Sequence, residues 1–227
     1  MKALIYKEFR LAVHPICYLF VFLFPLMILI PSYPLGVGFI YILSAYPILF
    51  LGANKGQQSN DLLYSTLLPV RKKDIVLARI ITVIILQVSF MLIMSALYPL
   101  ALTINDLVIT NSPDPSKVQS IGLGLNSYVF VLGIALVGYA LADLIFFPIY
   151  YRKGRSIVMS FLFTIIGFII YIFGVTLGVP YIPGLEFLMN LHIGIQFGIL
   201  GGAILISILL HIIVYRASSK LLERVDF

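Results

Sequence analysis

The sequence predicts an all-α membrane protein with six transmembrane helices and both termini on the cytoplasmic side. Three observations lead to this fold class. Of the 227 residues, 61% are hydrophobic and only 11% are charged, whereas a typical soluble domain carries about 25% charged residues. The apolar residues form six long runs, and the basic residues gather between alternate runs. A chain with so few charges cannot cover itself for water, so we expect lipid around most of its surface.

The six apolar runs have the length that a bilayer requires. A hydrocarbon core of about 30 Å needs roughly 20 apolar residues per helix. The runs cover residues 15–30, 35–53, 80–102, 125–150, 157–179 and 193–214. None has a polar residue at every second position, as the strands of a membrane barrel would. They are therefore predicted to be helices of one transmembrane domain over residues 1–227.

The first 13 residues are predicted to form an amphipathic helix that lies along the inner membrane surface. At helical spacing the apolar face carries Ile5, Phe9 and Ala12, the basic face carries Lys7 and Arg10, and Glu8 lies near the border. The chain then turns into the membrane at His14-Pro15. The following run ends without a small-residue cleavage site, so we interpret it as a retained helix and not as a signal peptide.

The basic residues orient the helices. All but one of the 15 Lys and Arg residues lie before the first run, between runs two and three, between runs four and five, or after the sixth, and the exception is Lys117. The positive-inside rule assigns the crowded side to the cytoplasm. The net charge of +6 therefore follows the membrane and gives no reason to expect a nucleic-acid partner. The outer connections are a turn at 31–34, a loop over 103–124 and an apolar segment at 180–192 that can dip back into the bilayer.

The longest cytoplasmic connection, residues 54–79, has an organised pattern. Residues 61–68 read as about two helical turns, which Pro69 ends. A basic collar follows at Arg71, Lys72 and Lys73, and Asp74 can cap the next helix. Two interpretations stay open on physical grounds: a helix lying among the lipid headgroups, or a docking element for a cytoplasmic partner.

Asp143 is the one acid inside a predicted span, and an intramembrane ionisable residue is by default a functional hypothesis. It precedes Arg152 by about 13 Å along a helix, which places it in the cytoplasmic third, where it can reach the interface or pair with a base. We favour this structural role over an ion site, because ion-coupled transporters usually hold several such groups near the midplane. His14, His192 and His211 are isolated in the sequence and are read as helix-end or interface residues.

The sequence contains no catalytic motif: neither a G-x-x-x-x-G-K-[ST] phosphate loop, nor H-E-x-x-H, nor G-x-S-x-G. The single cysteine, Cys17, excludes an intrachain disulfide and a cysteine-based metal cluster. We therefore expect a protein that is not an enzyme and binds neither a metal nor a cofactor directly.

Glycines at four-residue spacing mark two helix faces where close packing is possible in lipid. They are Gly174 and Gly178 in the fifth run, and Gly194, Gly198 and Gly202 in the sixth. Such a face suits either an intrachain seam or a subunit interface, and the sequence does not choose between them.

Three stretches carry a family resemblance. Residues 61–79, DLLYSTLLPVRKKDIVLAR, resemble the slPvsRkdivlaky stretch between the second and third helices of ABC type-2 transporter permeases. Residues 147–155, FPIYYRKGR, are similar to the turn after the fourth helix of that family, and Lys7-Glu8-Phe9-Arg10 resembles its N-terminal interfacial helix. The likeness spans the chain and is greatest to the permease subunits of phenol-soluble-modulin and antimicrobial-peptide exporters.

The resemblance implies an exporter in which two permeases, identical or homologous, join two cytoplasmic ABC ATPase subunits that bind ATP and Mg2+. The short coupling helix that docks on the ATPase would comprise Asp61, Leu62, Leu63, Tyr64, Leu67, Leu68 and Pro69, with the collar Arg71, Lys72 and Lys73 beside it. A second docking turn would comprise Arg152, Lys153, Gly154 and Arg155. The cargo would be an amphipathic or hydrophobic peptide, such as a toxin, modulin or antimicrobial peptide, moved out across a bacterial plasma membrane and conferring self-immunity.

The predicted organisation assigns the interfacial helix to residues 1–13, the first two spans to 15–53, the coupling segment to 54–79, the next two spans to 80–150, a cytoplasmic turn to 151–156, the last two spans to 157–214 and a cytoplasmic tail to 215–227. Two alternatives in function remain. One is an ion-coupled secondary transporter that uses Asp143, and the other is a membrane-embedded assembly or sensor protein that transports nothing.

Overall fold

The computed structural model describes residues 2–13, 15–29, 70–111, 128–152, 157–181 and 191–224. Every regular element in these ranges is helical. The elements are α1 (Lys2–Lys7), the π-helical η1 (Glu8–Ala12), α2 (Pro15–Leu23), the 3-10 helix η2 (Phe24–Leu29), α5 (Lys72–Asn111), α6 (Tyr128–Arg152), α7 (Ile157–Tyr181) and α8 (Ile193–Glu223). The predicted second span at 35–53 and the predicted coupling helix at 61–69 lie outside the described residues.

Four of the described helices, α5 to α8, are long and apolar enough to cross a bilayer. They correspond to the third, fourth, fifth and sixth predicted runs. A fifth span is reached if the N-terminal helices count as one bent span, since Lys2–Arg10 and Pro15–Leu29 meet at 86°. This bend falls where the sequence predicts that the interfacial helix turns into the membrane, and the Tyr18 hydroxyl donates to the Phe9 carbonyl across it at 2.6 Å. The total of six spans stays a prediction.

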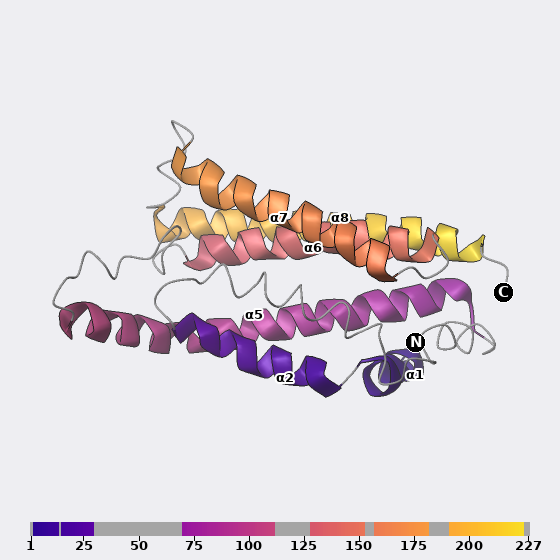
Figure 1. Cartoon of the computed structure of the whole chain (residues 1–227), viewed down its shortest axis with the longest axis horizontal. Helices are drawn as coiled ribbons and strands as arrows, with labels where there is room; N and C mark the ends of the chain where they lie inside the picture. The colour runs from indigo at the N-terminus through magenta and orange to yellow at the C-terminus, as the bar shows by residue number, and fades with distance from the viewer. Residues whose placement is uncertain are drawn as a thin grey trace.

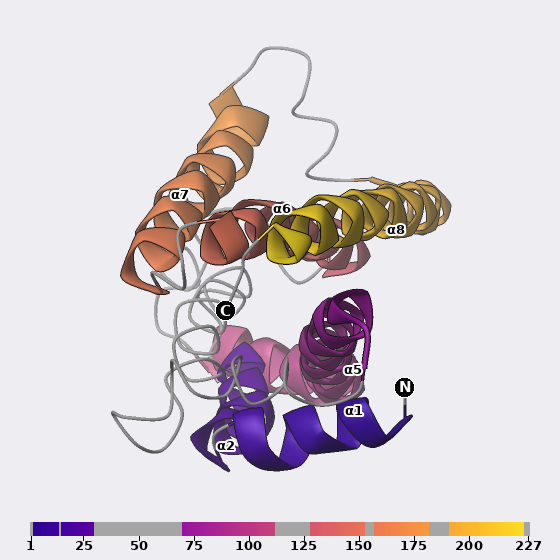
Figure 2. The ribbon, with the colours of Figure 1, turned by 90° about the vertical axis from the view of Figure 1, so that its right-hand side faces the viewer.

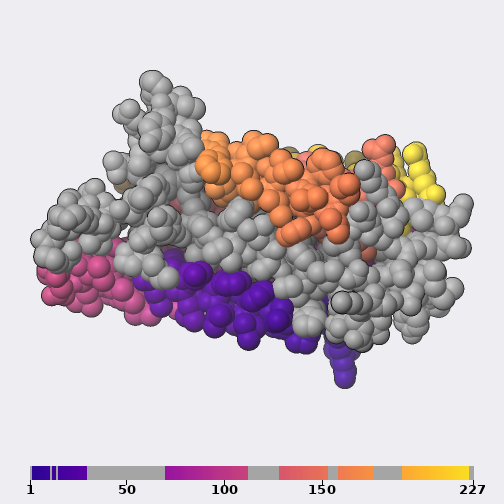
Figure 3. Space-filling model, in the orientation of Figure 1, coloured from indigo at the N-terminus to yellow at the C-terminus, as the bar shows by residue number. Residues whose placement is uncertain are grey.

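The helices form two layers (Figure 1, Figure 2). α6 is the centre of one layer and packs against both α7 and α8, whereas α5 packs against the N-terminal helices and also contacts α8. Figure 3 shows α2 and η2 lying along α5 at one edge of the molecule and α7 at the opposite edge. The N-terminal helices and α5 therefore form one unit, and α6 to α8 form another.

Two glycines of α6 bring its neighbours close. A Cβ added at Gly133 would lie 3.4 Å from the Cβ of Ala203 in α8. A Cβ added at Gly138 would lie only 2.9 Å from the rings of Phe168 and Tyr171 in α7. Small residues at helix contacts favour packing in lipid, and here they place α6 firmly between α7 and α8.

Hydrogen bonds join α6, α7 and α8 at the end of their layer where α6 and α8 begin. The Tyr171 hydroxyl donates to the Ile134 carbonyl at 2.9 Å. The Gln196 side chain accepts from the backbone N–H of Phe130 at 3.3 Å and donates to the Leu191 carbonyl at 2.9 Å. Because hydrocarbon offers no partner to polar groups, these contacts hold the starts of α6 and α8 together.

Two helices extend beyond the predicted spans. α5 continues to Asn111, although the outer loop was predicted to begin at Thr103. The stretch from 103 to 111 contains neither Gly nor Pro, and three of its side chains bond to carbonyls of the preceding turn. These bonds are Thr103 to Leu100, Thr110 to Asp106 and Asn111 to Leu107. α8 likewise runs to Glu223, so most of the predicted tail is helical.

The ends that the sequence assigns to the cytoplasm lie together. The starts of α5 and α7 and the ends of α6 and α8 gather at the end of the bundle that carries α1 (Figure 1). This arrangement agrees with the alternation on which the topology prediction rests. The orientation of this basic end toward the cytoplasm stays a prediction.

Candidate functional site

The basic collar marks the beginning of α5. The Arg71 side chain is 84% exposed, and its Nε donates to Asp74 Oδ2 at 3.1 Å. Because α5 begins at Lys72, Asp74 lies in the first turn and not at the cap position. Lys73 Nζ lies 3.2 Å from Glu223 Oε1, so the start of α5 meets the end of α8. Exposed pairs of this kind contribute about 0–1 kcal/mol, so a partner could displace these contacts of Arg71 and Lys73 at little cost.

The proposed docking residues are only partly described. Arg152 is exposed at the last position of α6. Lys153, Gly154 and Arg155 lie outside the described residues, as do Asp61, Leu62, Leu63, Tyr64, Leu67, Leu68 and Pro69. The docking role of both segments stays a prediction.

A buried ion pair ties the N-terminal helix to α5 close to the collar. Arg79 Nε donates to Glu8 Oε2 at 2.9 Å, and Arg79 Nη2 donates to Glu8 Oε1 at 3.3 Å. Both side chains are under 5% exposed, and Lys7 Nζ lies 3.5 Å from Glu8 Oε1. A two-pronged arginine–carboxylate contact is among the stronger polar contacts in proteins.

The position of Glu8 corrects the sequence prediction, which placed it near the border of the amphipathic helix. Leu4 and Glu8 are both buried, and they share the face that packs toward α5 because residues four apart are neighbours on a helix. The partner that makes this burial possible, Arg79, is 71 residues away in the chain, and no local pattern identifies it.

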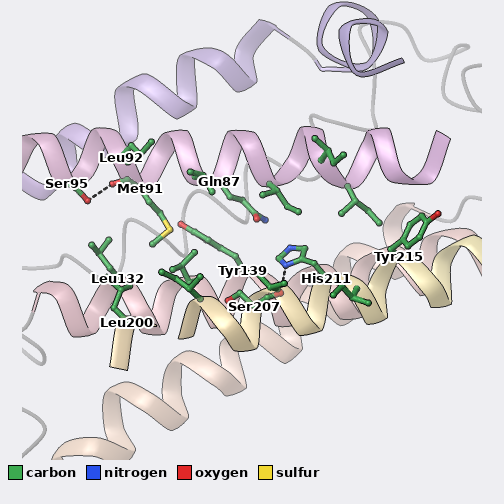
Figure 4. Close-up of a pocket in the computed structure, with 18 of the residues that line it drawn as sticks. Gln87, Met91, Leu92, Ser95, Leu132, Tyr139, Leu200, Ser207, His211 and Tyr215 are labelled. Carbon is green, nitrogen blue, oxygen red and sulfur yellow. Dashed lines mark hydrogen bonds between the residues drawn. The ribbon is translucent and has the colours of Figure 1, made fainter. Parts of the chain in front are cut away.

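A second buried polar cluster lies between the layers. Asp143 of α6 is fully buried. Its Oδ2 accepts from Gln87 Nε2 of α5 at 3.2 Å and lies 3.0 Å from His211 Nε2 of α8. The other ring nitrogen, Nδ1, lies 2.7 Å from the Ser207 carbonyl oxygen (Figure 4). Three spans thus converge on one carboxyl group.

The contacts of His211 fix the charge of this cluster. A carbonyl oxygen can only accept, so Nδ1 carries a proton toward Ser207. The contact between Nε2 and Asp143 Oδ2 holds one further proton, either on the ring or on the carboxyl group. In both cases the pair has no net charge, which removes most of the cost of burying an acid in a membrane span.

Sequence reasoning did not find the partner of Asp143, since 68 residues separate it from His211. The sequence carries only a rough signal: Asp143 precedes Arg152 by nine positions, and His211 precedes Arg216 by five. Both therefore lie in the half of a span nearer the basic end, which does not identify them as partners.

A cavity of about 610 Å³ lies between the layers, lined by α5, α6 and α8. Its polar lining residues are Gln87, Ser95, Tyr139, Ser207, His211 and Tyr215, and the others are aliphatic or methionine. Figure 4 shows Gln87 from α5 and His211 from α8 facing this space. None of the described lining residues is Lys, Arg, Asp or Glu.

Three of the five glycines with four-residue spacing have no close neighbour within the described chain. A Cβ added at Gly174, Gly198 or Gly202 would meet nothing within 4 Å. Gly194 lies near His192, whose Nδ1 accepts from the Gly194 N–H at 3.2 Å and caps α8. Gly178 falls where side-chain surroundings are not described. A subunit interface at these glycines stays a prediction.

No group of three or more His, Cys, Asp or Glu side chains within the described ranges is placed to share a metal ion. The comparison with protein families gives one match over nearly the whole chain: the model described as ABC-2 family transporter protein matches residues 3–223. Neither the curated proteins nor the solved structures include a match to this chain.

Proposed function

The chain belongs to the ABC-2 transporter family, and from this premise we propose that it is the permease subunit of an ATP-driven exporter of amphipathic or hydrophobic peptides. Membership makes it a multi-pass membrane permease of an ABC transporter. In this proposal the permease works with a separate ATPase that binds ATP and Mg2+ and with a second permease. Transport is outward across a bacterial plasma membrane and gives the cell self-immunity.

The observation that carries the proposal is the connected basic end of the bundle. The collar leads directly into α5, and Glu8 clamps the N-terminal helix to Arg79 of the same helix. Lys73 meets Glu223 at the end of α8. A force applied to the segment before Lys72 would therefore act on α5 and the N-terminal helix together.

A mechanism follows from the two layers. Closure of the ATPase dimer on ATP would carry the coupling segment and, with it, the layer of α5 and the N-terminal helices. The contacts between α5 and α6 that the structure gives are few: Gln87 with Asp143, Ser95 with Tyr128, and the stacked rings of Tyr98 and Tyr128. We therefore expect one layer to rock against the other about the contact of α5 with α8 and to release cargo outward.

The character of the spans supports an apolar or amphipathic cargo. Within residues 80–102, 125–150, 157–179 and 193–214, Asp143 is the only Asp, Glu, Lys or Arg, and the proton shared with His211 cancels its charge. A pathway without fixed charge gives a desolvated ion little compensation, whereas an amphipathic peptide can keep its apolar face against such walls.

The docking assignment is tested with the full permease purified together with its ATPase and reconstituted in vesicles. Reversing the collar charges, with Arg71→Glu, Lys72→Glu and Lys73→Glu combined, should leave basal ATP hydrolysis and lower export of a fluorescent amphipathic peptide at least tenfold. Arg224→Glu, an exposed position at the same end, is the matched control and should transport normally. Normal export by the collar variant would refute docking at this segment, and failure to co-purify any ATPase would refute the exporter itself.

A further inference from the structure

The N-terminal helix presents a row of basic and aromatic side chains on the side away from the bundle. Leu4 and Glu8 are buried toward α5, and Tyr6 lies two residues from each, about 200° around a helix. Tyr6 is 61% exposed, and Lys2 and Arg10, four residues to either side, are exposed with it. In Figure 1 and Figure 2 α1 lies at the edge of the molecule, with α5 on its inner side. Lys2, Tyr6 and Arg10, the basic row, therefore face the surroundings of the bundle.

The charge of the basic row is purely positive. The sequence groups Arg10 with Lys7, but the Lys7 side chain is 12% exposed and lies 3.5 Å from Glu8. Glu8 is the one acid of this segment, and it is buried against Arg79 on the opposite side of the helix. Lys2 and Arg10 therefore have no acid beside them on their own helix, and the row attracts anions.

Arg10 and Tyr6 form a preorganised pair of hydrogen-bond donors. Arg10 Nη1 donates to the Tyr6 hydroxyl at 2.7 Å, and Arg10 Cζ lies 5.9 Å from the centre of the Tyr6 ring. Because the hydroxyl oxygen accepts this bond, its own proton can donate outward, and the guanidinium has further N–H groups beside it. A phosphate ester offers acceptor oxygens and a negative charge, and arginine can bind it through two parallel bonds. The geometry therefore suits a phosphate group.

The depth of the basic row favours the headgroup layer over the aqueous space. The N-terminal helix is attached to α5 at Arg79, which lies seven residues after Lys72, about 10 Å along α5. The apolar run of α5 begins at the next residue, Ile80. The N-terminal helix also meets α2 at 86°, so it lies across the spans at the edge of the hydrocarbon. Tyrosine and basic side chains gather at this level of a bilayer.

An apolar surface for an acyl chain adjoins the basic row. The exposed side chains of α2 include Leu19 and Phe22, and α2 belongs to the first predicted span. The Tyr18 hydroxyl bonds to the Phe9 carbonyl at the corner between the two helices. The residues that follow these two in the chain, Leu19 and Arg10, are both exposed. A phosphate at Arg10 would therefore lie where an attached chain can follow α2 into the bilayer.

We propose that the basic row binds the headgroup phosphate of an anionic phospholipid, of the phosphatidylglycerol class, with an acyl chain along the exposed face of α2. A zwitterionic headgroup fits less well, because its own cation would lie near Lys2 and Arg10. Since Glu8 of the same helix holds Arg79, the bound lipid would fix the first turns of α5 at the membrane surface. The site is separate from the exported cargo, and its test does not depend on transport. An acidic surface of a cytoplasmic partner is the competing occupant.

The test uses the full chain in phosphatidylcholine nanodiscs that contain a small share of photoreactive phosphatidylglycerol. We expect saturable labelling of peptides from residues 2–13 and 15–29. Unlabelled phosphatidylglycerol should displace the probe at mole fractions at least tenfold lower than phosphatidylethanolamine, which has the same phosphate but no net charge. Glycerol phosphate added in excess to the buffer should not displace the probe, and this outcome distinguishes a lipid from a soluble phosphate.

Variants of the row separate a phosphate contact from general attraction by charge. Arg10→Gln should lower labelling of residues 2–13 about fivefold to tenfold, and Arg10→Lys, which keeps the charge without the planar fork, should recover only part of it. Tyr6→Phe keeps the ring, removes the hydroxyl donor and should lower labelling about threefold. Arg216→Gln, at an exposed position of α8 near the same end, is the matched control and should leave labelling of residues 2–13 unchanged.

Unchanged labelling of residues 2–13 in Arg10→Gln would overturn the proposal, as would equal displacement by phosphatidylethanolamine. Loss of labelling on addition of the purified ATPase, together with weaker co-purification of the ATPase by Arg10→Gln, would assign the row to a cytoplasmic partner. Both side chains are exposed, so the variants should unfold at the wild-type temperature in detergent without phospholipid, which shows that a change in labelling reports on binding.

Discussion

Two buried acids in this protein solve the same problem in different ways. Glu8, near the basic end, faces the guanidinium of Arg79 with Lys7 close by. Asp143, deeper between the layers, faces an imidazole and an amide. Arginine keeps its proton in proteins, so Glu8 always faces a positive charge. The second pair is neutral wherever its shared proton lies.

The difference follows the depth of each acid. The basic end lies close to water and headgroups, where lasting charges are tolerated and hold helices in place. Within the spans an unpaired acid is costly, and a partner that shares a proton with it leaves the pair without net charge. We therefore expect Glu8 and Arg79 to serve mechanical coupling, and Asp143 and His211 to keep the interior of the spans without net charge.

The largest loss of stability should come from breaking the pair of Glu8 and Arg79. Arg79→Met leaves the Glu8 carboxylate buried without its main partner, and loss of one member of a buried pair costs about 3–5 kcal/mol. We expect a large loss of thermal stability and faster proteolysis within residues 2–13. Arg10→Met, which removes an exposed arginine on the same segment, is the control and should change little.

The double variant Glu8→Met and Arg79→Met sharpens this prediction. Apolar residues that replace a whole buried pair are often neutral or stabilising, so the double variant should recover most of the stability lost in Arg79→Met. Export should nonetheless stay impaired if the pair transmits force to the N-terminal helix. Equal destabilisation by single and double variants would show that the pair has no special role.

A smaller effect should follow from His211→Leu. This change removes the ring from Asp143, but the carboxyl group can keep a proton and the amide of Gln87 still donates to it. We expect a loss of about 1–3 kcal/mol, the cost of unsatisfied buried polar atoms. The two variants are compared by thermal unfolding in the same detergent. The larger loss of stability identifies the pair that contributes more. A loss larger than that of Arg79→Met would reverse the comparison.

The smallest effect should come from Asp143→Asn. Both contacts of the carboxyl group meet at Oδ2. An amide nitrogen at that position can donate to His211 Nε2 and, once the Gln87 amide turns over, to Gln87 Oε1, so stability should change by about 1 kcal/mol or less. ATP-driven export should continue at a normal rate. Loss of transport with a normal fold would favour the ion-coupled alternative. Normal transport by Asp143→Asn in vesicles that carry both a proton gradient and ATP would exclude the ion-coupled alternative.

The sequence predicted the described spans well, because bilayer thickness and the scarcity of charge limit where an apolar helix can begin and end. Runs 125–150 and 157–179 correspond to α6 and α7 within a few residues. Helix ends outside the bilayer were less predictable, since the continuation of α5 to Asn111 depends on local side-chain bonds. The basic end itself was predicted from charge alone.

The contacts between distant helices were not predictable from one sequence. Glu8 with Arg79 and Asp143 with His211 join residues about 70 positions apart, and local periodicity carries no information about such partners. The glycines show the same limit. Spacing pointed to Gly198 and Gly202, whereas close approach within the described bundle occurs at Gly133 and Gly138 of α6 and at Gly167 of α7.

The length of α5 has a geometric consequence. From Lys72 to Tyr98, just before its internal Pro99, the helix is a rod of about 40 Å at 1.5 Å per residue. A tilt of about 10° at the collar would carry the far end of that rod by roughly 7 Å. A partner that moves only the first turn can thus shift the opposite side of the membrane, with Glu8 and Arg79 as the point where the N-terminal helix joins the lever.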